Sequence, residues 1–163
     1  MVTWRDARTD EDASHALLTE YFALRAAEFP AEAGEYRTVF PEPERFVPPA
    51  GVFLVVEDED LAGEAADVGC GGVRRIADAE DGSIRFEVKH LYLQPHTRGR
   101  GLGRALLVEL ELRSRELGAT HMVLDTRETQ VAAVALYRAS GYRDIPAYND
   151  NANASLWLHK ILA

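Results

Sequence analysis

We predict from the sequence an α/β (α+β) fold in which helices flank a mixed, mostly antiparallel β-sheet. Three strand-like runs, at residues 51–56, 68–76 and 83–93, follow one another through short, acidic, glycine-containing turns, which is the pattern of an antiparallel meander. A helix-like run at 104–117 then precedes a strand-like run at 120–125. A helix between two strands favours a parallel pair, so the run at 120–125 should lie beside the strand before it.

The remaining elements are less regular. Residues 2–5 suit an opening strand, and the polar residues 9–12 supply a cap and first-turn acids for a helix. That helix should direct four residues inward: Ala13, Leu17, Tyr21 and Leu24. Prolines in the segment 31–49 disfavour a regular helix there, so we expect a short helix at most and then an extended loop. Residues 154–161 read as a closing strand.

Composition limits the classes of function. The chain has 163 residues, 47% of them hydrophobic, which suits one domain spanning residues 1–163. We expect a cytoplasmic protein, because the sequence shows neither a membrane-length apolar run nor a signal peptide, and its single cysteine, Cys70, cannot form an internal disulfide. A formal net charge of −9 argues against nucleic acid as the main partner. The scattered histidines show no metal-ligand spacing, and both a monomer and a homodimer remain open.

The most informative segment is a glycine- and arginine-rich loop before the helix at 104–117. It is predicted to bind an anion, because glycines let the backbone approach a ligand and the first N–H groups of a helix point at it. The expected contacts are Arg98, Gly99, Arg100, Gly101, Leu102, Gly103 and Arg104. The spacing fits neither a Walker loop nor the dinucleotide fingerprint. A plain helix-capping turn with solvated arginines is the alternative reading.

A second motif lies downstream, at residues 129–142. Ala132, Leu136 and Ala139 recur at helical spacing, and Gly141 sits where a helix cap is expected. The order Arg-x-x-Gly-x-Gly after a strand ending Leu-Tyr-Leu, followed by this Ala-, Leu- and Tyr-bearing helix, resembles the two signatures of the GNAT superfamily of acetyl-coenzyme A-dependent N-acetyltransferases. The resemblance runs from about residue 51 to the end of the chain and is weaker before it.

The GNAT resemblance implies a more specific fold and a cosubstrate. In that family the two central parallel strands splay apart, and backbone groups at the positions of Leu91, Tyr92 and Leu93 bind the amides of coenzyme A. Gln130 stands where many members carry a cofactor-contacting asparagine, and its amide can make the same hydrogen bonds from a longer arm. Acetyl-CoA is therefore the expected cosubstrate, and no metal is expected.

The resemblance also places two catalytic candidates. Tyr137 matches the family's general acid, which protonates the leaving thiolate; a packed tyrosine with a hydrogen-bonded hydroxyl is the alternative. Glu87 matches the family's general base, acting directly or through water; a solvated strand charge paired with Arg85 or Lys89 is the alternative. His90 is a competing base by its ordinary pKa, and strand alternation should place it on the face opposite Glu87.

These inferences predict an N-acetyltransferase that moves acetyl from acetyl-CoA to a primary amine, with a small-molecule acceptor preferred. A protein or peptide acceptor is the alternative within the same chemistry. A non-catalytic module that senses acyl-CoA is an alternative from another class, and nucleic-acid binding through the Arg-Gly loop is a third. A hydrogen-bonded Tyr137 without an open acceptor pocket would favour the sensor.

Overall fold

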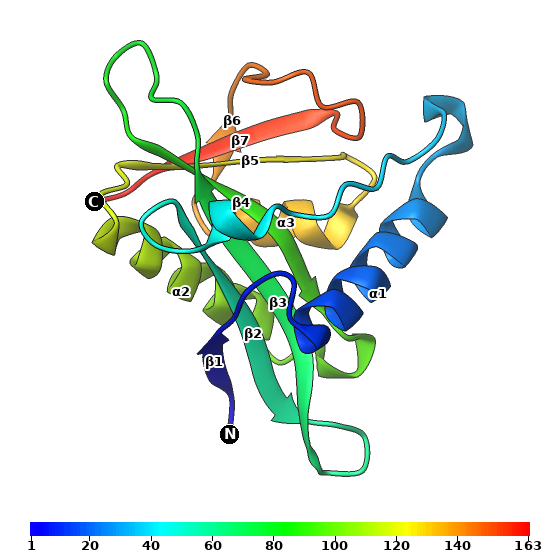
Figure 1. Ribbon diagram of the computed structural model, residues 1–163. Helices are drawn as coiled ribbons and strands as arrows, with labels where there is room; N and C mark the ends of the chain where they lie inside the picture. The colour runs from blue at the N-terminus through cyan, green and yellow to red at the C-terminus, as the bar shows by residue number, and fades with distance from the viewer.

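A computed structural model describes residues 1–163 and confirms the mixed α/β fold. Seven strands form one sheet in the order β1-β2-β3-β4-β5-β7-β6 (Figure 1). The strands span Thr3–Asp6 (β1), Gly51–Glu59 (β2), Ala65–Arg75 (β3), Arg85–Leu93 (β4), His121–Thr126 (β5), Arg143–Asp144 (β6) and Leu156–Ile161 (β7). Every neighbouring pair is antiparallel except β4 and β5, which run parallel as the crossover predicts.

Helices cover both faces of the sheet. The long helices are α1 (Asp12–Glu28), α2 (Leu102–Glu116) and α3 (Val131–Ala139). Leucines of α2 and residues of α3 join the larger hydrophobic core on one face, whereas α1 packs on the other face in a second core. Figure 1 shows α1 and α2 on opposite sides of the sheet. No helix in the fold combines the length and the apolar character that crossing a membrane requires.

The two central parallel strands separate soon after they meet. β4 pairs with β5 only through the three residues from Arg85 to Glu87. Beyond Glu87, β4 turns away from β5 (Figure 1), so the edge of β4 from Val88 to Leu93 that faces β5 has no partner strand. The splay implied by the family resemblance is therefore present, and it opens the sheet beside the loop that follows β4.

A β-bulge in β4 overturns one prediction. Cys70 pairs with Tyr92 and Gly72 with Lys89, so two residues of β4, His90 and Leu91, oppose one residue of β3. His90 adopts φ 58°, which interrupts the alternation of side chains. Its ring consequently packs in the α1-side core, on the same face as Glu87 and not on the opposite one.

Other differences from the sequence prediction are small. On α1 the most buried apolar residues are Leu17, Leu18 and Phe22, so the inward face is rotated slightly from the predicted one. The proline-rich segment contains only short 3-10 turns, as expected, at residues 31–33 and 43–46. The two-residue strand β6 was not predicted, because so short a strand has no periodicity to detect.

Candidate active site

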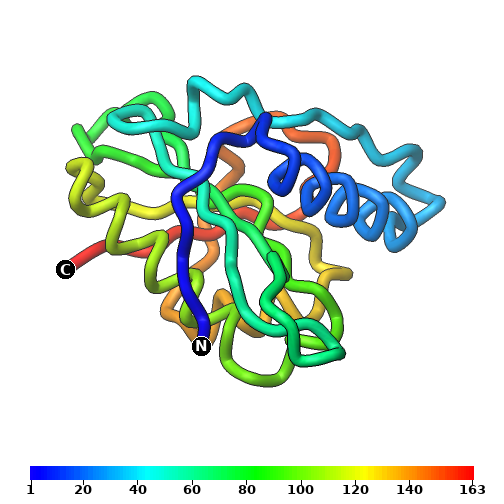
Figure 2. Tube along the Cα trace, turned by 60° about the horizontal axis from the view of Figure 1, so that its bottom comes forward, coloured from blue at the N-terminus to red at the C-terminus, as the bar shows by residue number.

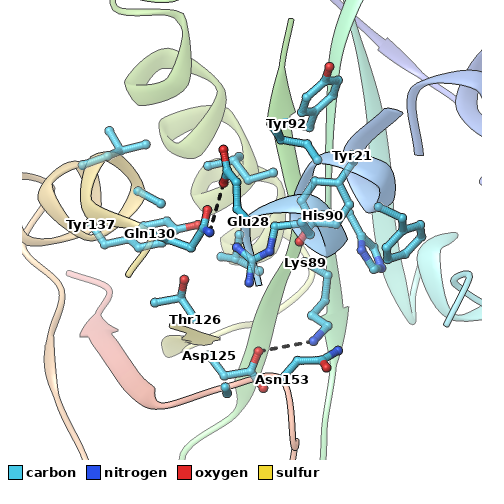
Figure 3. Close-up of a pocket in the computed structure, with 18 of the residues that line it drawn as sticks. Tyr21, Glu28, Lys89, His90, Tyr92, Asp125, Thr126, Gln130, Tyr137 and Asn153 are labelled. Carbon is cyan, nitrogen blue, oxygen red and sulfur yellow. Dashed lines mark hydrogen bonds and ion pairs between the residues drawn. The ribbon is translucent and has the colours of Figure 1, made fainter. Parts of the chain in front are cut away.

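One large cavity of about 1000 Å³ lies where the splayed strands open. Its lining comes from α1, β4, the loop before α2, the end of β5, α3, and the two connections 36–42 and 149–154. Most residues expected to bind a cofactor line it: Leu91, Tyr92, Leu93, Arg98, Gly99, Gly101, Leu102, Gly103, Arg104 and Gln130. Tyr137 and His90 line it too, whereas Glu87 and Arg100 do not. Figure 3 draws 18 of the lining residues and labels ten of them.

The loop before α2 presents a run of free donors. None of the six backbone N–H groups from Gly99 to Arg104 donates to an acceptor within the protein. Gly99 and Gly101 have φ near +80° and +77°, a conformation that side chains disfavour and glycine adopts freely. Since α2 begins at Leu102, these donors lie at the positive end of its dipole, which suits a pyrophosphate.

Gly103 contributes differently from the other glycines of the loop. A Cβ atom added at Gly103 would lie 3.3 Å from Leu136 Cδ2 on α3 and 3.6 Å from Leu93 Cδ1 on β4. At Gly99 and Gly101 an added Cβ would meet nothing within 4 Å. Gly103 therefore serves the close approach of α2 to α3 and β4, and the other two serve the turn itself.

The three arginines of this loop have different surroundings. Arg98 is exposed, and its Nε donates to the Leu93 carbonyl at 3.1 Å. Arg104 is exposed at the cavity and pairs with no carboxylate. Arg100 instead forms a 2.8 Å ion pair with Asp58 on β2, and the Asp58 side chain is only 4% exposed. Arg98 and Arg104 can thus reach a bound phosphate, while Arg100 is held by the neighbouring hairpin.

Tyr137 projects from α3 into the cavity, as Figure 3 shows. Tyr137 is buried as a whole, yet its hydroxyl forms no hydrogen bond within the protein and keeps some exposure to solvent. Burial raises the pKa of Tyr137 to about 12. The phenol therefore stays protonated at neutral pH with its proton available to a cavity ligand, which differs from the packed, hydrogen-bonded tyrosine considered as the alternative.

Gln130 occupies the N-cap position of α3, but its side chain makes no capping hydrogen bond and reaches across the cavity instead. Its amide nitrogen donates to Glu28 Oε2 at 3.1 Å, a contact drawn in Figure 3. Glu28 lies at the end of α1, so this bond links the helices on the two sides of the cavity mouth. The amide oxygen of Gln130 remains free to accept a hydrogen bond from a ligand.

Glu87 is buried in β4, with 1% of its surface exposed. Arg74 contacts its Oε1 at 2.9 and 3.0 Å, and the Tyr148 hydroxyl donates to its Oε2 at 2.6 Å. The alternative of a solvated charge paired with Arg85 or Lys89 is therefore wrong. Arg74 lines the cavity and Glu87 does not, so Glu87 can influence the cavity only through the guanidinium that it binds.

His90, at the bulge, is surrounded by aromatic rings. Its imidazole centroid lies 5.5 to 5.9 Å from the ring centroids of Tyr21, Phe22 and Phe46. Burial, and after it the nearby charge of Lys89, lower the pKa of His90 to about 3. The imidazole is consequently neutral at pH 7 and a weak base.

A polar cluster at the end of β5 was not predicted from the sequence. Asp125 accepts hydrogen bonds from Asn149 at 2.7 Å and from Asn151 at 3.2 Å, and pairs with Lys89 at 3.4 Å. Burial by itself would raise the pKa of Asp125, but the Lys89 ammonium and the two amides outweigh it and lower that pKa. The only sequence signal was the polar turn 149–154, whose partners no local pattern could reveal.

The same turn closes one side of the cavity. The side chain of Asn153 accepts from the Arg37 N–H at 3.0 Å and donates to the Arg37 carbonyl at 2.8 Å. Two distant connections, 36–42 and 149–154, are thereby joined at one end of the sheet. Figure 2 shows the light-blue to cyan connection passing over that end, near the orange turn.

The chain matches one family model, described as the acetyltransferase (GNAT) family, over residues 12–142. Among curated proteins, an uncharacterized N-acetyltransferase of Schizosaccharomyces pombe is 36% identical over 107 residues, which are 66% of this chain and 61% of that protein. The chain thus spans about three fifths of the length of this relative.

Solved structures share the fold over the whole chain. A Klebsiella pneumoniae protein described as an acyl-CoA N-acyltransferase has a TM-score of 0.71 and 27% identity, covering 100% of this chain and 99% of its own. A phosphinothricin acetyltransferase of Sinorhizobium meliloti, solved in complex with acetyl-CoA, has a TM-score of 0.62 and 20% identity. This match covers 99% of the present chain and 88% of that one. At that identity the second likeness shows the fold alone.

Proposed function

The chain belongs to the GNAT family of acetyltransferases, and on that premise we propose that it transfers acetyl from acetyl-CoA to a primary amine, with a small molecule as acceptor. The observation that carries the proposal is the continuity of one cavity. It joins the free N–H groups of the loop at 99–104, the unpaired edge of β4 and the free hydroxyl of Tyr137.

The residues present suit coenzyme A along its length. The six loop N–H groups, with Arg98 and Arg104 beside them, supply donors and positive charge for the pyrophosphate. The unpaired edge of β4 at Leu91 to Leu93 offers backbone groups to the pantetheine amides. Gln130 completes the set with a side-chain amide at the start of α3.

Tyr137 supplies the proton that the transfer needs. As the amine nitrogen bonds to the acetyl carbon, the carbon–sulfur bond breaks, and the sulfur leaves with the electron pair. The Tyr137 hydroxyl donates its proton to that sulfur, giving the thiol, and is reprotonated from solvent. A phenol whose pKa is raised to about 12 still holds its proton over the working pH range.

The amine must enter neutral and loses one proton after attack. Neither candidate base is well placed to take it directly, because Glu87 lies outside the cavity lining and His90 is a weak base. We therefore assign the proton to cavity water, and give Glu87 a positioning role through Arg74. In this arrangement the pH of half-maximal turnover reports the pKa of the acceptor amine.

The sensor alternative loses its support. A hydrogen-bonded Tyr137 and a closed acceptor side would have favoured it, whereas the hydroxyl has no partner within the protein and the cavity extends to α1 and the turn 149–154. A protein or peptide acceptor stays an alternative, because the open cavity could admit a chain terminus as well as a small amine.

Binding of coenzyme A tests the proposal. A ligand at about 100 times its Kd stabilises the folded state by about 2.7 kcal/mol, which for this size raises the melting temperature by roughly 5–10 °C. Thermal unfolding with and without coenzyme A measures this shift. A folded protein with an unchanged melting temperature at millimolar coenzyme A would contradict the proposal. If the melting temperature rises, an amine panel read by thiol release identifies the acceptors.

A further inference from the structure

Resting on the proposed function, we infer that the amine acceptor carries a carboxylate, which Arg25 binds, next to an apolar or aromatic body. The acceptor is then an amino acid or a compound that shares its amine and carboxylate. Three observations support this substrate class: a guanidinium inside the cavity that has no carboxylate partner, the use of the nearby carboxylates by other partners, and an aromatic wall beside the guanidinium.

Arg25 lies on α1, is half-buried, and lines the cavity. It forms no ion pair, and Glu28, one helical turn later, accepts a hydrogen bond from Gln130. The Arg25 guanidinium also lies close enough to the Tyr36 hydroxyl to lower the pKa of that phenol against the larger effect of burial. The ring of Tyr21 holds the guanidinium at 6.0 Å from its centroid. Arg25 and Tyr137 line the same cavity, and the Arg25 charge lowers the pKa of Tyr137 against the larger effect of burial.

The other charges of the cavity are either paired or exposed. Among the cations, Arg74 is bound to Glu87 and Lys89 to Asp125. Among the anions, Asp125 is saturated by Lys89 and two asparagine amides. A half-buried cation without a counterion is costly, and a ligand carboxylate offers the bidentate partner that a guanidinium favours.

The wall next to Arg25 is aromatic. It is built from α1 and the connection at 36–42 by Tyr21, Phe22, Tyr36 and Phe40. Phe22 and Phe40 pack edge to face with centroids 5.0 Å apart, and Phe40 keeps 42% of its surface exposed at the cavity. Such a wall favours an apolar or aromatic acceptor body.

A polycationic acceptor fits poorly. It would bring a second positive charge to Arg25 in a cavity whose buried carboxylate, Asp125, is already paired with Lys89. Like charges in a partly desolvated site repel, so discrimination against polyamines follows from the same residue that selects a carboxylate.

The test compares matched amines with and without a carboxylate. The purified full chain, with saturating acetyl-CoA, is assayed by thiol release on phenylalanine, phenylalaninamide and phenethylamine, and on leucine, leucinamide and isoamylamine. We expect kcat/KM to be at least about 10-fold higher for the acid than for its amide or its decarboxylated amine. A factor of this size is what one charge-assisted hydrogen bond contributes. The polyamine spermidine should react more slowly than any acid.

Arg25→Gln should bring the ratio of kcat/KM between acid and amide to about 1, mainly through a higher KM for the acid, and Arg25→Lys should restore part of it. Arg115→Gln, an exposed arginine on α2 outside the cavity, is the matched control and should keep the wild-type ratio. Melting temperatures verify that each variant folds.

The outcomes separate the two levels of the proposal. Failure to bind coenzyme A would overturn the proposed function itself. Binding of coenzyme A with equal turnover of acids and amides, with a ratio unaffected by Arg25→Gln, or with no turnover of any acid in the panel, would overturn the assignment of a carboxylate-bearing acceptor while leaving the proposed function in place.

Discussion

The Tyr148 hydroxyl lies 2.6 Å from Glu87 Oε2, and this contact joins the connection before β7 to the first half of β4. Burial and the Glu87 charge raise the pKa of Tyr148 far above its usual range. The hydroxyl therefore always donates, and with Arg74 on the other oxygen the buried carboxylate has both of its oxygens bound.

Tyr148→Phe should lower the free energy of unfolding by about 1–3 kcal/mol, because it leaves a buried carboxylate oxygen without its donor. Urea denaturation monitored by circular dichroism measures the loss. Tyr137→Phe is the matched control, since its hydroxyl has no partner within the protein, and its cost should be on the order of 0.5 kcal/mol or less. Equal costs for the two variants would argue against the Tyr148–Glu87 contact.

Tyr137→Phe should reduce kcat by roughly 10²-fold while the Kd of coenzyme A changes little, because the ring and its packing stay and only the proton donor is lost. Steady-state thiol release and calorimetry give the two quantities. With the pKa of Tyr137 raised to about 12, the wild-type enzyme should show no loss of kcat from this group below about pH 10. Wild-type turnover in the variant would leave protonation of the sulfur to water.

Gly101→Ala should weaken coenzyme A binding by about 10-fold or more, because alanine disfavours the φ of +77° and displaces the N–H groups that follow. Gly82→Ala is the control: its φ is +86° in the turn before β4, it lies outside the cavity, and an added Cβ there also meets nothing within 4 Å. Both variants should lose about 1 kcal/mol of stability, but only the first should lose affinity in calorimetry.

Arg98→Glu and Arg100→Gln should separate binding from stability. Arg98 lies at the cavity, so reversing its charge should weaken coenzyme A binding by about 10-fold, and by less at high salt. Arg100 holds the buried Asp58 carboxylate, so its loss should cost about 1–3 kcal/mol of stability with little change in Kd. A large change of Kd in Arg100→Gln would place a phosphate at Arg100.

His90 should make folding sensitive to acid. Its pKa falls from 6.5 to about 3 on folding, so between these values the unfolded chain binds more protons than the folded one. Its contribution is fully present above pH 6.5 and is lost as the pH falls toward 3, by up to about 1.4 kcal/mol per pH unit.

His90→Asn tests that contribution, because asparagine tolerates the positive φ of the bulge and does not titrate. Urea denaturation of both proteins at pH 7, 6, 5 and 4 gives two curves, and carboxylate titration affects them alike. We expect the stability difference between them to shrink steadily as the pH falls. A difference independent of pH would mean that the imidazole is solvated in the folded protein.

The sequence alone determined the order of the elements, the fold class, and the two motifs that meet at the cavity. Periodicity and glycine positions depend on neighbours within a few residues, so the strands, the helices and the donor-rich start of α2 could be predicted. The location of Tyr137 on α3 followed for the same reason.

Only the tertiary structure decided which side chains share the cavity. A one-residue bulge moved His90 to the face of Glu87, and no local pattern marks such an insertion. The partners of Glu87 and Arg37 lie 61 and 116 residues away in the chain, at Tyr148 and Asn153. Contacts of this range depend on the order and the splay of the strands in the sheet, which set distances that residue spacing along the chain does not determine.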